Sequence, residues 1–473
     1  MMEEESLRPK KDKQGLVQKM AEKLADIASF FARLFTKAKS VLPEDSSFLP
    51  SSVKTNIQQA IPFWIASFFV GLIAVGYTKL FLYAETLLEY LLDWQSWLVF
   101  IITPLCFFYA WFFVHRFAPN AKGSGIPQVM AAIELSNPKH EEKIGKLLSF
   151  RIMIIKIVSS VLMVLGGGAV GREGPTIQIA GSIFRMVYRW IPASWPRLSK
   201  QSFILTGAAA GLAAAFNTPL GGIVFAIEEL SRMHLRFFRT ALFTAVIISG
   251  LAAQGLLGPY LYLGYPDVGH LNLSVFAAVG GAAILAGIGG ALMSKFTIRV
   301  LRWKAKFNIT RQVVFIIGAG LLVATIAFFF NDAILGSGKT LMNDVLFSKY
   351  KYSSWHTMLL RILGPIIAFN TGAAGGVFAP SLAAGASIGS YFASWLELVG
   401  GNANIVILSG MVGFLTGVTR TPFTSAILVL EMTDRHSVIF HLMLAAMLSN
   451  IAAIMVEKHS FYEQLKKAYM DSD

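Results

Sequence analysis

Three short glycine-rich segments interrupt the apolar sequence, and each carries a proline near its end. They are Gly123-Ser124-Gly125-Ile126-Pro127, Gly171-Arg172-Glu173-Gly174-Pro175 and Gly376-Val377-Phe378-Ala379-Pro380. Because proline is favoured in the first turn of a helix, each segment predicts a helix start. The first N–H groups of a helix lack an internal acceptor and carry partial positive charge, so three converging starts would bind a small anion. Packing of small residues between helices is the alternative for any single segment.

Glu173 places a carboxylate inside the second of these segments. A carboxylate among helix starts resembles the anion that those starts would bind, and it can occupy the same site. Protonation removes its charge, frees the site and takes up one proton, which would link anion movement to proton movement. An acid within a membrane protein is a candidate functional group by default. A structural pairing with Arg172 is the alternative.

The composition indicates that most of the surface faces lipid. The chain has 473 residues, of which 55% are hydrophobic and 14% charged, and its mean hydropathy is +0.59. Soluble domains carry about 25% charged residues. The net charge of +14 lies in short basic linkers such as Lys139 to Arg151, which is typical of cytoplasmic loops and argues against a nucleic-acid partner. Cys106 is the sole cysteine, so an intrachain disulfide is excluded.

Four apolar runs are long enough to cross a bilayer as single helices, which takes about 20 residues; they are 61–83, 97–115, 273–296 and 313–330. Glycine, proline and small polar residues interrupt four other stretches, 162–184, 203–230, 362–395 and 405–432. These stretches predict broken helices, which are tolerated in a membrane where they line a cavity or are buried in protein. We expect no signal peptide at the N-terminus, because it has no early apolar core, and Gln14 to Lys39 predicts an amphipathic surface helix.

An internal repeat divides the apolar part of the chain. Gly207 to Glu228 aligns without a gap with Gly410 to Glu431, and both stretches contain a Thr-Pro pair. The segment that contains Glu173 aligns with the segment that contains Phe378 at nearly the same offset. Two collinear blocks predict two related halves. Interrupted helices at matching places in both halves indicate the substrate site of a transporter.

These segments resemble the signatures of the chloride channel/transporter (CLC) family, closest to its prokaryotic H⁺/Cl⁻ exchange transporters. The resemblance rests on GSGIP, GREGP, GGVFAP, TPLGGIVFAIEE and TPFTSAILVLEMTD and runs from about residue 60 to the end. It implies an all-α integral membrane fold with tilted and broken helices in two inverted-topology repeats. We expect a cytoplasmic segment at 1–55, repeats at 60–250 and 265–460, and a short tail at 461–473 without appended regulatory (CBS) domains.

The resemblance implies a role for each matching residue. The Ser124 hydroxyl and the Val377 and Phe378 amides correspond to groups that bind chloride, and the Tyr462 hydroxyl completes that site. Glu173 corresponds to the gating glutamate, which also transfers protons on the extracellular side.

Glu229 distinguishes exchange from passive conduction in this family. It corresponds to the glutamate that transfers protons on the intracellular side of exchangers, where passive channels usually have an apolar residue. A solvated helix-end acid beside Arg232 is the alternative, and Glu228 has a repeat partner in Glu431, which suggests a structural pair. We therefore predict a chloride/proton antiporter, with a passive chloride channel as the alternative.

The remaining expectations follow from the family and from what the motifs lack. We expect a transporter rather than an enzyme, without metal or cofactor, whose partners are chloride, protons, lipid and a second copy of the chain. We expect a multi-pass protein of the cell membrane (the inner membrane in a Gram-negative bacterium) with both termini cytoplasmic.

Lys156 is expected either to raise the potential at the anion or to pair with Glu134. Gly336-Ser337-Gly338-Lys339-Thr340 resembles a phosphate-binding loop, but Ala333 replaces its first glycine.

Overall fold

The computed structural model describes residue 33 and residues 51–136, 141–192, 194–196, 199–230, 239–258, 261–269 and 274–470. Within these ranges the chain is helical, and strand pairing is limited to two isolated bridges. The predicted amphipathic helix from Gln14 to Lys39 lies outside the described residues, apart from Arg33.

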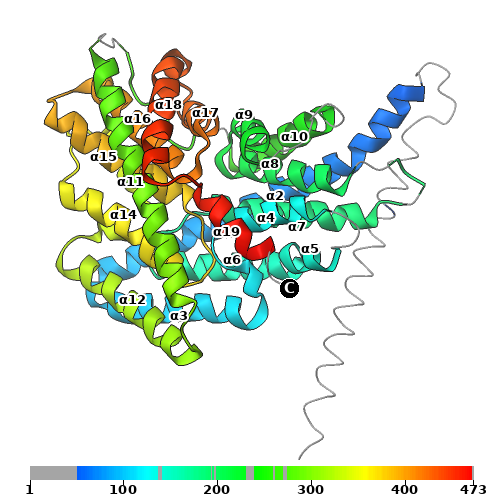
Figure 1. The fold of residues 1–473 in the computed structure, drawn as a ribbon, viewed down its shortest axis with the longest axis horizontal. Helices are drawn as coiled ribbons and strands as arrows, with labels where there is room; N and C mark the ends of the chain where they lie inside the picture. The colour runs from blue at the N-terminus through cyan, green and yellow to red at the C-terminus, as the bar shows by residue number, and fades with distance from the viewer. Residues whose placement is uncertain are drawn as a thin grey trace, which may run out of the picture.

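The first half of the chain forms long helices interrupted by short ones (Figure 1). They are α2 (Ser51–Trp94), α3 (Val99–Phe117), α4 (Ile126–Glu134), α5 (Glu141–Leu147), α6 (Phe150–Leu165), α7 (Glu173–Trp190), α8 (Lys200–Phe216), α9 (Pro219–Phe225) and α10 (Arg239–Leu257). A π-helical turn, Ala226–Leu230, extends α9. Such turns are rare and occur frequently at functional sites.

The second half repeats this order of long and short helices, except that α5 has no counterpart in it. They are α11 (Val275–Lys304), α12 (Ile309–Phe329), α13 (Lys339–Phe347), α14 (Trp355–Asn370), α15 (Phe378–Trp395), α16 (Gly400–Thr419), α17 (Pro422–Thr433) and α18 (Ile439–Val456), followed by α19 (Phe461–Met470). In Figure 1, α8–α10 and α16–α18 form two groups, and α19 lies beside α4.

Eight helical stretches in the described residues are long and apolar enough to cross a membrane. They include all four predicted spans, although α2 continues well beyond the predicted 61–83. They also include Glu141–Leu165, Thr240–Leu257 and His436–Val456, which the prediction did not name as spans. The predicted breaks occur before α7, between α8 and α9, before α15 and between α16 and α17.

The internal repeat is visible in two reciprocal helix caps. The Glu228 carboxylate accepts hydrogen bonds from the amides of Phe423 (3.1 Å) and Thr424 (2.6 Å) at the start of α17. The Glu431 carboxylate accepts from the amides of Leu220 (3.0 Å) and Gly221 (2.6 Å) at the start of α9. Each carboxylate satisfies amides that have no acceptor in their own helix. The two halves therefore hold each other through equivalent residues.

Small residues bring the helices around the centre into close contact. A Cβ on Gly385 in α15 would overlap the carbonyl oxygen of Gly410 in α16. In the other half, a Cβ on Gly211 in α8 would lie 2.6 Å from Ala180 Cβ in α7. Such contacts let helix backbones approach each other in a membrane, where van der Waals packing drives helix association.

Candidate functional site

The three glycine-rich segments meet in the middle of the fold and are joined through their backbones. Gly123 donates to Ala373 O (2.8 Å), and Gly375 donates back to Gly123 O (3.0 Å). Gly171 and Gly376 exchange a pair of hydrogen bonds of 2.8 and 2.7 Å. Since these bonds join segments far apart in sequence, they fix the starts of α4, α7 and α15 relative to one another.

Each segment leads directly into a helix, as its proline predicts. Gly125 precedes α4 with φ of 101°, a left-handed conformation that suits glycine. Glu173 is the first residue of α7, and Phe378 is the first of α15, with Val377 before it. A Cβ on Gly174 would overlap Ser124 Oγ, so the start of α7 lies directly against Ser124. Glycine at this position permits that approach.

The Glu173 side chain points back into this junction and is 1% exposed. Its Oε2 atom lies beside Gly171, as does the amide nitrogen of Ala379 in the first turn of α15. Arg172 and Glu173 form no ion pair within the described residues, and the Arg172 guanidinium instead lies 6.0 Å from the Tyr262 ring centre. The carboxylate therefore sits among helix starts without a neutralising partner in contact.

Tyr462 closes the junction from α19. Its ring is completely buried and stacks on Phe378 with centroids 6.1 Å apart and planes 15° apart. The neighbouring Phe461 packs edge-on against Phe369 at 5.1 Å, which holds the start of α19 against α14.

Three buried polar atoms at this junction have no hydrogen-bond partner among the described residues: Ser124 Oγ, Glu173 Oε2 and the Tyr462 hydroxyl. A buried polar group without a partner is costly, so such atoms call for an explanation. Two of them are hydroxyl donors that can face an anion, and the third is itself an anionic group. The two hydroxyl groups and the nearby helix starts fit a small anion.

Lys156 lies behind the first glycine-rich segment and is completely buried. Its ammonium donates to the carbonyl oxygens of Ala121 and Gly123, each at 2.8 Å. The suggested pairing with Glu134 is wrong, because the Lys156 ammonium bonds to these carbonyl groups, and the Glu134 carboxylate bonds to Lys466 at 2.6 Å. The Lys156 charge is thus held next to the Ser124 segment by carbonyl groups.

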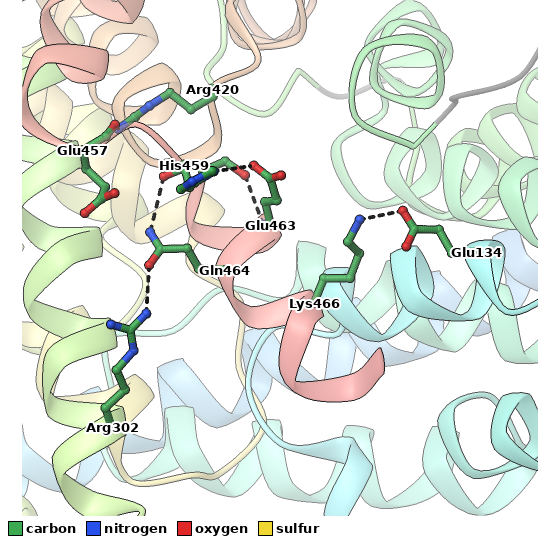
Figure 2. Close-up of polar contacts among 9 residues, drawn as sticks. Glu134, Arg302, Arg420, Glu457, His459, Glu463, Gln464 and Lys466 are labelled. Carbon is green, nitrogen blue, oxygen red and sulfur yellow. Dashed lines mark hydrogen bonds and ion pairs between the residues drawn. The ribbon is translucent and has the colours of Figure 1, made fainter. Parts of the chain in front are cut away.

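Glu229 lies in the π-helical turn after α9 and lines a cavity of about 290 Å³. Its Oε1 atom is buried without a hydrogen-bond partner among the described residues. Charged side chains from α4 and α19 line the same cavity, namely Glu134, Glu463 and Lys466. Figure 2 shows these three around α19, with His459 bonded to Glu463 at 3.3 Å.

A second cavity, also about 290 Å³, reaches Ser124 from another face of α19. Lys122 and Arg302 contribute positive charge to its wall, and Arg302 contacts Gln464 of α19 at 3.5 Å (Figure 2).

Glu463 and Lys466 face the Glu229 cavity, whereas Gln464 and residues 465, 468 and 469 face the Ser124 cavity. Helix α19 therefore separates an approach to Glu229 from an approach to Ser124.

The sequence did not predict the role of α19 beyond Tyr462. Neither the Lys466–Glu134 ion pair nor the Arg302–Gln464 contact has a local signal, because the partners are far apart in the chain. Apolar residues recur every three or four positions after Tyr462, at Leu465, Ala468 and Tyr469, which is typical of an amphipathic helix but does not indicate which elements that helix contacts.

Eight candidate membrane spans and broken helices in two related halves define a multi-pass membrane protein whose central site is built from helix starts. The chain belongs to the family described as "Voltage gated chloride channel", whose sequence model matches residues 106–453.

Bacterial exchange transporters are among the relatives of this chain. It is 31% identical over 376 residues to the H⁺/Cl⁻ exchange transporter ClcA of Cronobacter sakazakii, covering 76% of this chain and 78% of that protein. It is 31% identical over 409 residues to ClcA of Citrobacter koseri, covering 81% and 82%. The crystal structure of a slow cyanobacterial Cl⁻/H⁺ antiporter superimposes with a TM-score of 0.76 at 23% identity, covering 88% of this chain and 99% of that one. That likeness confirms the all-α fold of this family.

Proposed function

We propose that the protein is a secondary active antiporter that exchanges chloride for protons across a cell membrane. The observation that carries this proposal is the pair of cavities on different faces of α19, one reaching Ser124 and the other reaching Glu229. An exchanger needs an approach for the anion and a separate approach for the proton. The ClcA relatives, which are named H⁺/Cl⁻ exchange transporters, support the proposal.

Chloride enters through the cavity lined by Lys122 and Arg302 and reaches the Ser124 hydroxyl. The Ser124 and Tyr462 hydroxyls hold it together with the amides of Val377 and Phe378 at the start of α15. These neutral donors and helix-end partial charges bind an anion without a lysine or arginine in direct contact. Binding of this moderate strength allows release, which transport requires.

Glu173 links the two substrates. As a carboxylate it takes the place of an anion among the helix starts, and as a protonated acid it withdraws and leaves that place to chloride. Protons reach it from the outer side, and Glu229 exchanges them with the inner side through its own cavity. Glu173 thus cannot gain or lose a proton without changing whether chloride can occupy the site among the helix starts.

A passive chloride channel is the second candidate. It would need the Ser124 cavity and Glu173 but not an acid at position 229. The Glu229 Oε1 atom is buried beside a cavity rich in charged groups and has no hydrogen-bond partner among the described residues, which favours exchange. A structural acid would instead accept backbone hydrogen bonds, as Glu228 does.

We further propose that two copies of the chain form a dimer with one pathway in each, and that both termini are cytoplasmic. Helices α10 and α18 present exposed apolar side chains that suit a partner within the membrane, including Leu251, Phe440 and Ile451.

The substitution Glu173→Gln tests the gate. The amide cannot exchange a proton and carries no charge to compete with chloride. Liposomes containing this variant are expected to release chloride while a chloride gradient no longer moves protons. Chloride-driven pH changes that persist in the variant would contradict the role of Glu173.

A further inference from the structure

The sequence Gly336-Ser337-Gly338 in the second half repeats Gly123-Ser124-Gly125 of the first, and the two loops have the same backbone shape. The first glycines have φ of 65° and 63°, and the second have φ of 84° and 101°. Each loop leads directly into a short helix, α13 or α4. The likeness to a phosphate-binding loop is therefore explained by the internal repeat.

The contacts of the two loops are also equivalent. Gly123 donates to Ala373 O in the segment before α15, and Gly336 donates to Gly167 O (3.0 Å) in the segment before α7. Each loop is thus joined to the other half of the molecule.

A buried cation supports each loop from behind. Arg361 follows Lys156 at the same spacing as Gly376 follows Gly171, so the two cations occupy matching positions in α14 and α6. Lys156 bonds to Gly123 O, and Arg361 Nη1 bonds to Leu335 O (3.0 Å) and Gly336 O (3.2 Å). The second half therefore has the same two features as the first: a helix that starts after the glycine-rich loop, and a buried cation that bonds to the carbonyl groups of that loop.

The Ser337 loop holds a carboxylate in the structure. Glu85 of α2 accepts a hydrogen bond from the Ser337 amide at 3.1 Å. Arg361 is 7% exposed, its Nε has no hydrogen-bond partner among the described residues, and its guanidinium lies beside Gly338. An anionic group thus bonds to the backbone of the Ser337 loop, beside a buried cation whose Nε has no partner among the described residues.

The Tyr262 ring lies between this loop and Arg172, the residue before Glu173. The loop lines a cavity of about 470 Å³ whose residues differ from those of the two cavities beside α19. Lys339 lies 5.1 Å from the Tyr262 ring centre, and Arg172 lies 6.0 Å from the same centre. Acidic groups also line the cavity, namely Glu89, Asp93, Asp332 and Asp344.

We propose that the Ser337 loop is a second anion site, related to the Ser124 site by the internal repeat, and that the Glu85 carboxylate fills it. The ligand that it would take without Glu85 is a small monovalent anion such as chloride or bromide. The inference rests on the proposed chloride role of Ser124, because that role is the reason to expect an anion at the equivalent loop of the second half.

Glu85 holds the site because it is tethered. A group attached to a neighbouring helix acts at an effective concentration in the millimolar range or above, whereas a free anion must also overcome the acidic cavity wall. Replacing the Glu85 side chain removes both the competitor and one negative charge. Anion binding at Ser337 should then appear where the unmodified protein shows none.

The test is anomalous diffraction from bromide in crystals of the full-length protein. Wild type is compared with Glu85→Ala, with Glu85→Met, which keeps a side chain of similar length, and with Glu89→Ala. The last removes an acid one turn further along α2 that lines the same cavity but does not bond to the loop. The Ser124 site serves as an internal reference in every crystal.

The expected result is a bromide peak next to the Ser337 amide, several-fold above background, in the two Glu85 variants alone. Absence of this peak while the Ser124 peak is present would overturn the inference. A Ser337 peak in wild type or in Glu89→Ala would also overturn it, because Glu85 would not be the occupant. A Ser337 peak without a Ser124 peak would instead contradict the proposed function and leave the second site standing.

Discussion

At the residue scale, the proposed chloride site depends on two hydroxyl groups from distant parts of the chain. The Ser124 hydroxyl precedes α4 and the Tyr462 hydroxyl lies in α19, and both are buried without a hydrogen-bond partner among the described residues. A hydrogen bond to a charged group contributes roughly 1.5–3 kcal/mol. Each hydroxyl should therefore contribute measurably to anion affinity.

Tyr462→Phe is expected to weaken chloride binding about tenfold or more, since about 1.4 kcal/mol corresponds to a factor of ten. The ring stacking on Phe378 remains, so the effect comes from the hydroxyl. Calorimetric chloride titration of the purified protein measures it. Tyr188→Phe is the control, because Tyr188 lies in the last turn of α7, about 22 Å along the helix from Glu173. Equal affinities for Tyr462→Phe and wild type would remove Tyr462 from the site.

The adjacent acids Glu228 and Glu229 should respond differently to the same substitution. Glu229→Gln is expected to abolish proton transport and spare chloride flux, because the amide cannot exchange a proton. Glu228→Gln is expected to lower the melting temperature, because it disrupts the cap of α17. Parallel measurements of coupled transport and thermal unfolding distinguish the two. Unchanged proton transport in Glu229→Gln would contradict its assignment.

The candidate site residues that could be predicted from the sequence lie in segments whose glycines and prolines mark a helix start. Ser124, Glu173 and Phe378 adjoin glycines and prolines that mark helix starts, and the structure brings the three segments together. The partners of Lys156 and the Glu85–Ser337 hydrogen bond could not be predicted. A contact between distant segments depends on tertiary packing, which leaves no periodic pattern in either segment.

At the scale of elements, the site requires the start of α7 to touch the Ser124 segment. Gly174→Ala is expected to reduce anion binding and flux strongly, because the added Cβ would overlap Ser124 Oγ. Gly255→Ala in α10 is the matched control, since its Cβ would have no neighbour within 4 Å in the part of the chain that the structure describes. Ion flux in liposomes and chloride titration measure both variants. Wild-type behaviour of Gly174→Ala would show that the approach of α7 is not needed.

Helix breaks were easier to predict than helix lengths. Glycine and proline mark the starts of α7 and α15 because they act locally on the backbone. The length of α2, Ser51–Trp94, exceeds its predicted span because polar residues continue the helix beyond the apolar run. Apolar periodicity identifies the part of a helix that faces lipid or protein, and helices extend past it.

At the scale of the whole molecule, the two halves are joined by equivalent contacts. Glu228 and Glu431 cap each other's helices, and the loops around Ser124 and Ser337 each bond to the opposite half. The repeat predicted two related halves but not how they interlock. Helix α19 follows both halves, and its position between two cavities gives the molecule separate approaches to Ser124 and Glu229.

Coupling between chloride and protons is the central claim, and it is best measured on the unmodified protein. Chloride-loaded liposomes containing the protein are diluted into low chloride, with the membrane potential clamped near zero and the external pH recorded. Chloride flowing outward should drive protons inward, so the external pH should rise without any initial pH gradient. Chloride release at constant pH would contradict the account and indicate passive conduction.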